Sequence, residues 1–189
     1  MDILNLLKDT KTILNGHFKL SSGLHSDTYI QCAQVLKYPE YAELLGKSLS
    51  EKFAEKPDYI VSPALGGLII GHEVARAFNI PFLFTERNKE GQMELRRNFY
   101  IEENKKVIII EDVITTGKST LEVYETLKEF NPQIIGFGCI VNRSKKEKLN
   151  NLPIKSLLEI EAKTYEPDNC PLCKKNIPII KPGSRQNTK

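Results

Sequence analysis

Four consecutive apolar residues, Val107 to Ile110, constrain the fold of this chain more than any other feature. Three are isoleucine and one is valine, and such a run is typical of a strand that is buried on both faces of a sheet. Short apolar runs that predict further strands lie at 59–61, 81–84, 134–141 and 157–160. Helical patterns separate several of them, at 68–78 and from 118 to 130. Alternating strands and helices predict an α/β fold with a mostly parallel sheet flanked by helices.

The segments outside this alternation carry weaker signals. Apolar residues at helical spacing predict a helix over 2–15, ending before Gly16, and another from about Pro39, where proline suits the first turn. Loops and short strands are expected at 17–37, and a mobile loop or hairpin at 86–98. The length of 189 residues predicts a single domain, with an N-terminal part at 1–37, an α/β core at 38–165 and a tail at 166–189 packed on either.

Composition narrows the function classes. The net charge of +3 is small and the basic residues are scattered, so we expect no nucleic-acid partner. No apolar stretch reaches the roughly 20 residues that span a bilayer, so we expect no membrane association. The N-terminus lacks the pattern of a signal peptide, which predicts a cytoplasmic protein.

The segment from Val107 to Thr120, VIIIEDVITTGKST, carries the clearest chemistry. Glu111 and Asp112 follow the buried strand and begin a loop expected at 111–118, whose small and hydroxyl residues lead into a helix. Ligands of open α/β sheets bind outside the carboxyl ends of the strands, and a helix N-terminus favours phosphate. A nucleotide-binding P-loop is excluded because its first glycine, six positions before Lys118, is replaced by Asp112. The carboxylates can instead accept hydrogen bonds from ribose hydroxyls; an ordinary strand–turn–helix with a surface acid pair is the alternative.

A second glycine turn follows the strand predicted at 59–61. It contains Ala64, Leu65, Gly66 and Gly67 and opens a helix. Glycines at such a turn let backbone N–H groups approach the oxygens of an anion closely, although many strand–helix turns contain two glycines.

These motifs together resemble the type I phosphoribosyltransferase family. The segments GHFKLSSGLHSDTYIQCAQVL at 16–36, TERNKEGQMELRRNF at 85–99, NRS at 142–144 and CPLCKKNIPIIKPGSR at 170–185 narrow the resemblance to orotate phosphoribosyltransferases, in particular their short bacterial and archaeal branch. The resemblance covers nearly the whole chain. It implies the type I phosphoribosyltransferase fold with a small N-terminal hood, and transfer of ribose 5-phosphate from phosphoribosyl diphosphate to orotate in pyrimidine synthesis.

Site residues can be carried over from the resemblance. It implies that phosphoribosyl diphosphate is bound by Glu111, Asp112, Val113, Ile114, Thr115, Thr116, Gly117, Lys118 and Ser119, and its diphosphate by the loop 64–67. Thr115 and Arg143 are implied to bind orotate, and a guanidinium suits a planar carboxylate. Tyr29 and Ile30 are implied to cover the base, with core packing as the alternative.

The resemblance also implies a catalytic lid that carries Arg87 and Lys89 and acts with Asp112. The sequence departs from the family here, because the lid histidine of some relatives is absent and Gly66 and Ser21 stand where better-known relatives have lysines. Arg96 and Arg97 could supply charge instead, with a solvated surface run as the alternative.

The implied cofactor is Mg²⁺, held mainly by substrate and not by protein ligands. The implied partners are orotate, phosphoribosyl diphosphate and a second copy of the chain, in a homodimer that shares lid residues across subunits. Two other functions stay open: transfer to another base, and a non-catalytic regulator that senses phosphoribosyl diphosphate.

The cysteines and histidines complete the candidate residues. Cys170 and Cys173 have zinc-knuckle spacing, but only Cys32 and Cys139 could complete an all-cysteine set, so free thiols are the favoured interpretation and zinc or a local disulfide the alternatives. The three histidines, His17, His25 and His72, are too dispersed in sequence to indicate a ligand set.

Overall fold

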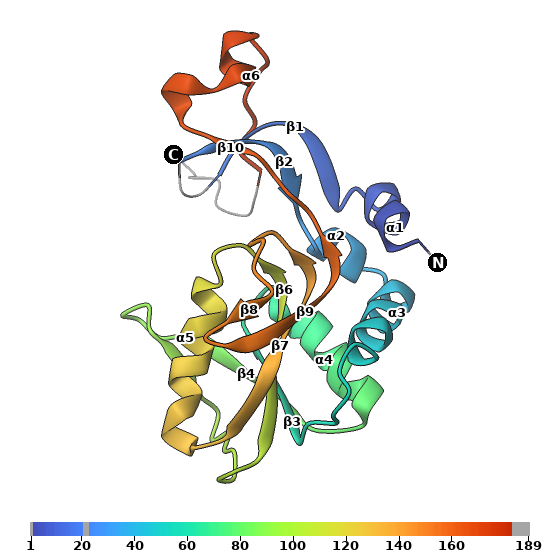
Figure 1. Cartoon of the computed structure of the whole chain (residues 1–189), viewed down its shortest axis with the longest axis vertical. Helices are drawn as coiled ribbons and strands as arrows, with labels where there is room; N and C mark the ends of the chain where they lie inside the picture. Colours follow the sequence, from blue (N-terminus) through green and yellow to red (C-terminus); the bar gives the residue numbers. More distant parts are fainter. Residues whose placement is uncertain (1, 21–22, 183–189) are drawn as a thin grey trace. The chain divides into compact units, whose positions relative to one another are not determined.

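The chain forms two compact units in a computed structural model that describes residues 2–20 and 23–182. Met1–Gln31 and Glu161–Lys189 make up the small unit, and Cys32–Ile160 the large unit. Figure 1 shows both, coloured along the sequence. No helix in these described ranges has the length and apolar character needed to cross a membrane.

The large unit is built on a seven-stranded sheet in the order β5-β4-β3-β6-β7-β9-β8. The strands are β3 (Tyr59–Pro63), β4 (Phe82–Arg87), β5 (Met93–Leu95), β6 (Lys106–Ile114), β7 (Gln133–Asn142), β8 (Lys148–Leu149) and β9 (Leu152–Glu159). Strands β4, β3, β6, β7 and β9 are parallel, and β5 and β8 pair antiparallel at the two edges. The helices are α2 (Ala33–Leu36), α3 (Pro39–Ser50), α4 (Gly67–Phe78) and α5 (Lys118–Leu127), followed by the 3-10 turn η1 (Lys128–Phe130). The predicted mostly parallel α/β sheet is therefore confirmed.

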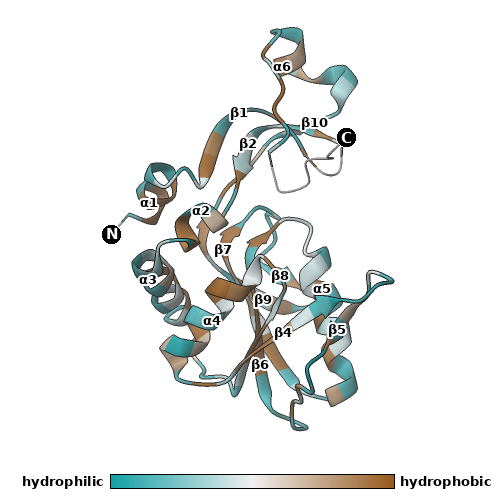
Figure 2. Ribbon diagram, turned by 180° about the vertical axis from the view of Figure 1, so that it is seen from behind, coloured by the Kyte–Doolittle hydropathy of each residue, from teal (hydrophilic) through white to brown (hydrophobic). Residues whose placement is uncertain are grey.

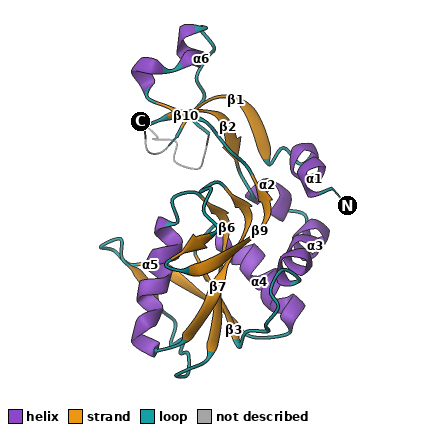
Figure 3. Cartoon of the chain, in the orientation of Figure 1, coloured by secondary structure: helices purple, strands orange, loops and turns teal. Residues whose placement is uncertain are grey.

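The core of the large unit follows from the apolar strands. Val107, Ile108, Ile109 and Ile110 are all fully buried, as expected for a strand covered on both faces. Helices lie on the two sides of the sheet in Figure 3, and hydrophobic colour gathers on the inner strands in Figure 2. Burial of each such side chain contributes roughly 1.5–3 kcal/mol, so the central strand is a rigid support for whatever follows it.

The strand order places a topological switch point at the carboxyl ends of β3 and β6. The chain leaves β3 through α4 to β4 on one side, and leaves β6 through α5 to β7 on the other. Because such crossovers are right-handed, α4 and α5 must cover opposite faces, which Figure 1 shows. The loops after β3 and β6 therefore diverge, and this switch point is where ligands bind in open α/β sheets.

The small unit contains a three-stranded antiparallel sheet in the order β1-β2-β10. Its elements are α1 (Ile3–Asp9), β1 (Ile13–Lys19), β2 (His25–Ile30), β10 (Thr164–Tyr165), the 3-10 turn η2 (Pro167–Asn169) and α6 (Pro171–Lys174). The tail returns to β1, because the Lys19 N–H donates to the Ile180 carbonyl (2.9 Å) and the Ile180 N–H donates to the His17 carbonyl (2.8 Å). The first and last segments of the chain are thus joined in one sheet.

Three predicted boundaries were wrong. The strand predicted at 157–160 is β9, which begins at Leu152 and ends at Glu159. The first helix ends at Asp9 and not before Gly16, because Lys11 has a left-handed φ of 56° and Ile13 then pairs with Ile30 in the sheet. Strand β6 does not end before Glu111 but continues to Ile114, because pairing with β7 persists through Ile114↔Asn142. The loop expected at 111–118 is accordingly only 115–117. At 86–98 the hairpin alternative is correct, since β4 and β5 pair from Thr85↔Leu95 to Arg87↔Met93.

Candidate functional site

Two adjacent carboxylates lie on the last residues of β6. Glu111 is only 8% exposed, and its Oε1 accepts the Asp112 N–H at 3.1 Å. Asp112 Oδ1 in turn accepts the Val113 N–H at 2.8 Å. Burial raises the pKa of both carboxyls, and for Glu111 the charge of Asp112 raises the pKa further. Neither carboxylate forms an ion pair with a described residue, so the pair is suited to receive hydroxyl donors or a cation.

The loop beyond the carboxylates has the geometry of an anion site. Gly117 has a left-handed φ of 81° and caps α5, and the Thr116 hydroxyl accepts the Lys118 N–H at 3.3 Å. Helix α5 has ten residues, so its first turn offers backbone N–H groups and the positive end of a helix dipole. This loop therefore can hold a phosphate next to the two carboxylates.

The glycine turn after β3 lies directly against Asp112. A Cβ atom at Gly66 would be 2.8 Å from Asp112 Oδ1, and one at Gly67 would be 2.9 Å from the Ile110 carbonyl. The Ala64 N–H donates to the Thr85 carbonyl (2.8 Å), the Ala64–Leu65 peptide bond is cis, and the Leu65 side chain is 82% exposed. Two segments separated by more than 40 residues thus meet at the switch point, and glycine permits the contact.

Arg143 is placed next to the same loop by its backbone. Its N–H donates to the Ile114 carbonyl at 2.7 Å, one residue before Thr115. The buried side chain of Asn142 organises the turn around it: Oδ1 accepts the Ser144 N–H (2.9 Å) and hydroxyl (2.7 Å), and Nδ2 donates to the Lys146 carbonyl (2.9 Å). Sequence reasoning missed this positioning role of Asn142. Its signal was an asparagine at a strand end, which favours side-chain-closed turns.

The predicted lid residues lie on the β4–β5 hairpin. Arg87 donates to Glu122 of α5 (2.5 Å) and to the Gly91 carbonyl (2.6 Å). Arg97 lies beyond β5 and donates twice to Glu86, at 2.9 Å each. Lys89 is exposed in the turn and makes no ion pair with a described residue. The hairpin therefore carries cations, with both of these arginines paired to glutamates.

Tyr29 and Ile30 lie on β2 of the small unit. The Tyr29 hydroxyl donates to Gln31 Oε1 at 2.8 Å, and its ring lies 5.7 Å from that of Phe18. Ile30 is 9% exposed and pairs with Ile13. Both residues thus have packing partners inside the small unit, and a contact with a base stays a prediction.

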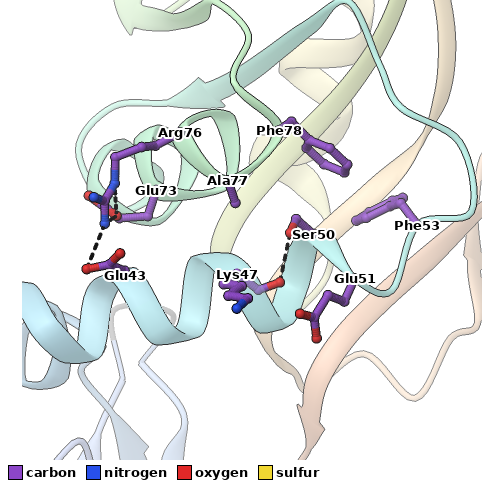
Figure 4. A pocket seen from close by; sticks show the side chains of 9 residues that line it. All are labelled: Glu43, Lys47, Ser50, Glu51, Phe53, Glu73, Arg76, Ala77 and Phe78. Atoms are coloured by element: carbon purple, nitrogen blue, oxygen red, sulfur yellow. Dashed lines mark hydrogen bonds and ion pairs between the residues drawn. The ribbon is translucent and has the colours of Figure 1, made fainter.

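A groove between α3 and α4 is separate from these residues (Figure 4). Arg76 crosses it, forming ion pairs with Glu43 (3.2 Å) and Glu73 (2.7 Å). Its lining includes Ser50 and Phe78, which end their helices. Helices of an alternating α/β unit run opposite to the strands, so these ends lie at the edge away from the loops after β3 and β6.

The geometry agrees with comparisons to known proteins. The family model of the phosphoribosyl transferase domain matches residues 33–170. The chain therefore belongs to the phosphoribosyltransferases. It is 47% identical to an orotate phosphoribosyltransferase of Caldicellulosiruptor saccharolyticus over 97% of this chain and 96% of that protein. That similarity places it in the orotate phosphoribosyltransferase family, in agreement with the resemblance noted from the sequence.

Solved structures confirm the predicted fold. Orotate phosphoribosyltransferase of Aeropyrum pernix superposes with a TM-score of 0.72 at 21% identity, covering 85% of this chain and 94% of that one. Adenine phosphoribosyltransferase of Thermoanaerobacter pseudethanolicus superposes with a TM-score of 0.62 at 16% identity, covering 70% of this chain and 88% of that one. Because proteins named for two different bases share it, the fold alone does not decide the base.

Proposed function

We propose that this protein is an orotate phosphoribosyltransferase: it transfers the ribose 5-phosphate group of phosphoribosyl diphosphate to orotate, giving orotidine 5′-monophosphate and diphosphate. The observation that supports this most directly is the 2.7 Å hydrogen bond from the Arg143 N–H to the Ile114 carbonyl. This bond holds the backbone of Arg143 beside the loop at 115–117, which supports binding of an anionic base next to a ribose phosphate. The family membership supports the same reaction.

The donor site would be formed by residues 111–119 and 64–67. Carboxylates accept hydrogen bonds from hydroxyls, so Glu111 and Asp112 would hold the ribose, while the N–H groups of the loop before α5 would hold the 5-phosphate. The turn at 64–67 would hold the diphosphate. Its contact with Asp112 supports this role, because it brings the turn next to the proposed ribose site. Donor and leaving group would then be fixed by two loops that already touch.

The acceptor site would be formed by Thr115 and Arg143. The guanidinium would pair with the orotate carboxylate, and the Thr115 hydroxyl would hydrogen-bond the ring. The ring nitrogen of orotate forms a bond to the anomeric carbon as the bond from that carbon to diphosphate oxygen breaks. The proton on that nitrogen passes to the departing diphosphate or to water. No strong protein base is required, which accounts for a lid without histidine.

The family implies Mg²⁺, and the residues present fit it. Glu111 and Asp112 are buried neighbours with raised pKa values and no cationic partner among the described residues, so a cation carried by the substrate would relieve their repulsion. When bound, magnesium would neutralise charge on the diphosphate. The carboxylates would hold it mainly through the ribose hydroxyls.

The β4–β5 hairpin would act as the lid. Arg87 and Lys89 would stabilise the departing diphosphate and exclude water from the ribose. Arg87 is bound to Glu122 in this structure, so the proposal requires that it exchange this partner for the substrate. We further propose a cytoplasmic homodimer in which the lid is shared between subunits.

Absorbance of orotate tests the proposal. The full chain is mixed with orotate, phosphoribosyl diphosphate and magnesium, with adenine, hypoxanthine and uracil as parallel acceptors. Consumption of orotate alone is expected, and Asp112→Asn should reduce turnover sharply while Asp9→Asn, at an exposed helix end, should not. Consumption of another base would refute the acceptor assignment. Binding of phosphoribosyl diphosphate without turnover of any base would favour the alternative, a non-catalytic regulator that senses phosphoribosyl diphosphate.

A further inference from the structure

Two histidines and two cysteines meet inside the small unit. The histidines lie within 17–25, near the start of the chain, and the cysteines within 170–173, near its end. The ligand atoms of His17, His25, Cys170 and Cys173 all lie within 4.8 Å of one another. Both imidazoles and Cys170 are buried, while Cys173 is exposed. The expectation that the histidines are too dispersed to form a ligand set was therefore wrong for His17 and His25. Strands β1 and β2 bring them together, and the turn of α6 adds both sulfurs.

Four of the six separations between the ligand atoms are close to the edges of a tetrahedron around one ion. Zinc bonds of about 2.3 Å to sulfur and 2.0–2.1 Å to nitrogen give edges of about 3.5 Å between sulfur and nitrogen and about 3.3 Å between two nitrogens. Three of the four distances from sulfur to nitrogen are 3.5 Å (Cys170 to His17), 3.7 Å (Cys173 to His17) and 3.4 Å (Cys173 to His25). His17 Nε2 and His25 Nδ1 are 3.0 Å apart.

Hydrogen bonding prepares His17 for this role. Its Nδ1 lies 2.7 Å from the Ile177 carbonyl, which can only accept, so Nδ1 carries the proton and Nε2 offers its lone pair. Three groups, from His25, Cys170 and Cys173, converge on that one lone pair. One lone pair can accept only one hydrogen bond well, whereas one cation can bind all four atoms. A carbonyl on the other ring nitrogen is the usual support of a metal-bound histidine.

We propose that His17, His25, Cys170 and Cys173 form a structural zinc site. Two thiolates and two imidazoles are a ligand set that favours zinc over magnesium or calcium, and four protein ligands leave no open position for catalysis. The site supplies the second half that the C-x-x-C pair lacks in sequence, from histidines about 150 residues away. It is independent of the proposed reaction.

The apolar core of the small unit is small, so a metal ion would contribute to its stability. Its buried apolar residues among those described are only Leu6, Leu7, Phe18, Ile30 and Cys170. Cores of this size rarely stabilise a fold alone, and metals or disulfides commonly supplement them. A zinc ion would join the first hairpin to the tail, and its release would loosen both segments together.

Metal analysis of the full chain, purified under reducing conditions, tests the proposal. We expect one zinc per chain, retained in His72→Gln, whose side chain is 62% exposed outside the cluster, and lost in Cys173→Ser, which changes the exposed ligand. Zinc-free protein titrated with Co²⁺ should develop the visible bands of tetrahedral cobalt with thiolate charge transfer, and Zn²⁺ should abolish them. This second measurement uses the unchanged chain, so it decides the matter even if Cys173→Ser fails to fold.

Three results would overturn the site. One is a full chain that neither contains zinc nor binds Zn²⁺ or Co²⁺ after reduction. Another is Cys173→Ser that retains the whole zinc equivalent. The third is a Cys170–Cys173 disulfide that persists in reductant, since both sulfurs are then unavailable to metal.

Discussion

Gly117→Ala should destabilise the large unit more than an equivalent change elsewhere. Gly117 has a φ of 81°, and a Cβ atom there would be 2.6 Å from Leu149 Cδ1. The left-handed conformation costs a residue with a side chain roughly 1–2 kcal/mol, and forcing a methyl group into a packed site costs roughly 1–3 kcal/mol. The free energy of unfolding should therefore fall by roughly 2–5 kcal/mol.

Gly91→Ala is the matched control. Gly91 has nearly the same φ, 83°, but a Cβ atom there meets nothing within 4 Å. Only the conformational cost of roughly 1–2 kcal/mol applies, and the change in unfolded-chain entropy is the same for both variants. The two variants should differ by roughly 1–3 kcal/mol, which is the contribution of the contact with Leu149.

Urea unfolding measures the difference. The chain has no tryptophan, so far-ultraviolet circular dichroism or tyrosine fluorescence serves as the signal. An unchanged slope with a lower midpoint identifies a change in stability. In the double variant with Leu149→Ala the penalty of Gly117→Ala should shrink, because the clash is removed. Equal midpoints for Gly117→Ala and Gly91→Ala would refute the reasoning.

Three further outcomes follow from the site. The pKa of Glu111 is raised in the folded chain, so folding is accompanied by proton binding above pH 4.5, the ordinary pKa of glutamate. The wild type should therefore lose stability relative to Glu111→Gln as the pH rises above 4.5. Urea midpoints of the two proteins that stay parallel across pH would contradict this. Arg143→Ala removes a charge-assisted pair of roughly 1.5–3 kcal/mol, so the KM for orotate should rise about 10- to 100-fold and that for phosphoribosyl diphosphate much less; equal rises would disprove the carboxylate role. Asn142→Ala leaves buried partners unsatisfied, so the free energy of unfolding in urea should fall by roughly 1–3 kcal/mol. The KM for orotate should also rise, because the turn that carries Arg143 loosens. An unchanged KM would show that this turn does not position Arg143.

The sequence was sufficient where local pattern decides structure. The β-branched run at Val107–Ile110 predicted a doubly covered strand, and the proline at 39 predicted the start of α3; both are confirmed. The sequence also predicted that the two acids, the loop and the helix follow one another within 107–120, although the acids lie inside β6. Such features need only neighbouring residues, so periodicity and turn chemistry reveal them.

The sequence was insufficient where distant segments meet. The contact between Gly66 and Asp112 and the cluster around His17 depend on strand order and register, which no local pattern contains. The same is true of the end of β6, because pairing with β7 and not composition carries that strand on to Ile114. Sequence spacing therefore underestimated the ligand set that includes Cys170 and Cys173.

The divergence of α4 and α5 from neighbouring strands has a consequence for how such enzymes change substrate. The proposed donor contacts lie after β3, at the end of β6 and in the loop that follows β6, whereas Arg143 follows β7. Each strand end is a separate attachment point on one stiff sheet. The residues after β7 can therefore be replaced without moving the loops that would hold the ribose phosphate and diphosphate. A sheet whose loops at β3 and β6 stay constant while the residues after β7 vary is a physical route by which one fold can accept several bases.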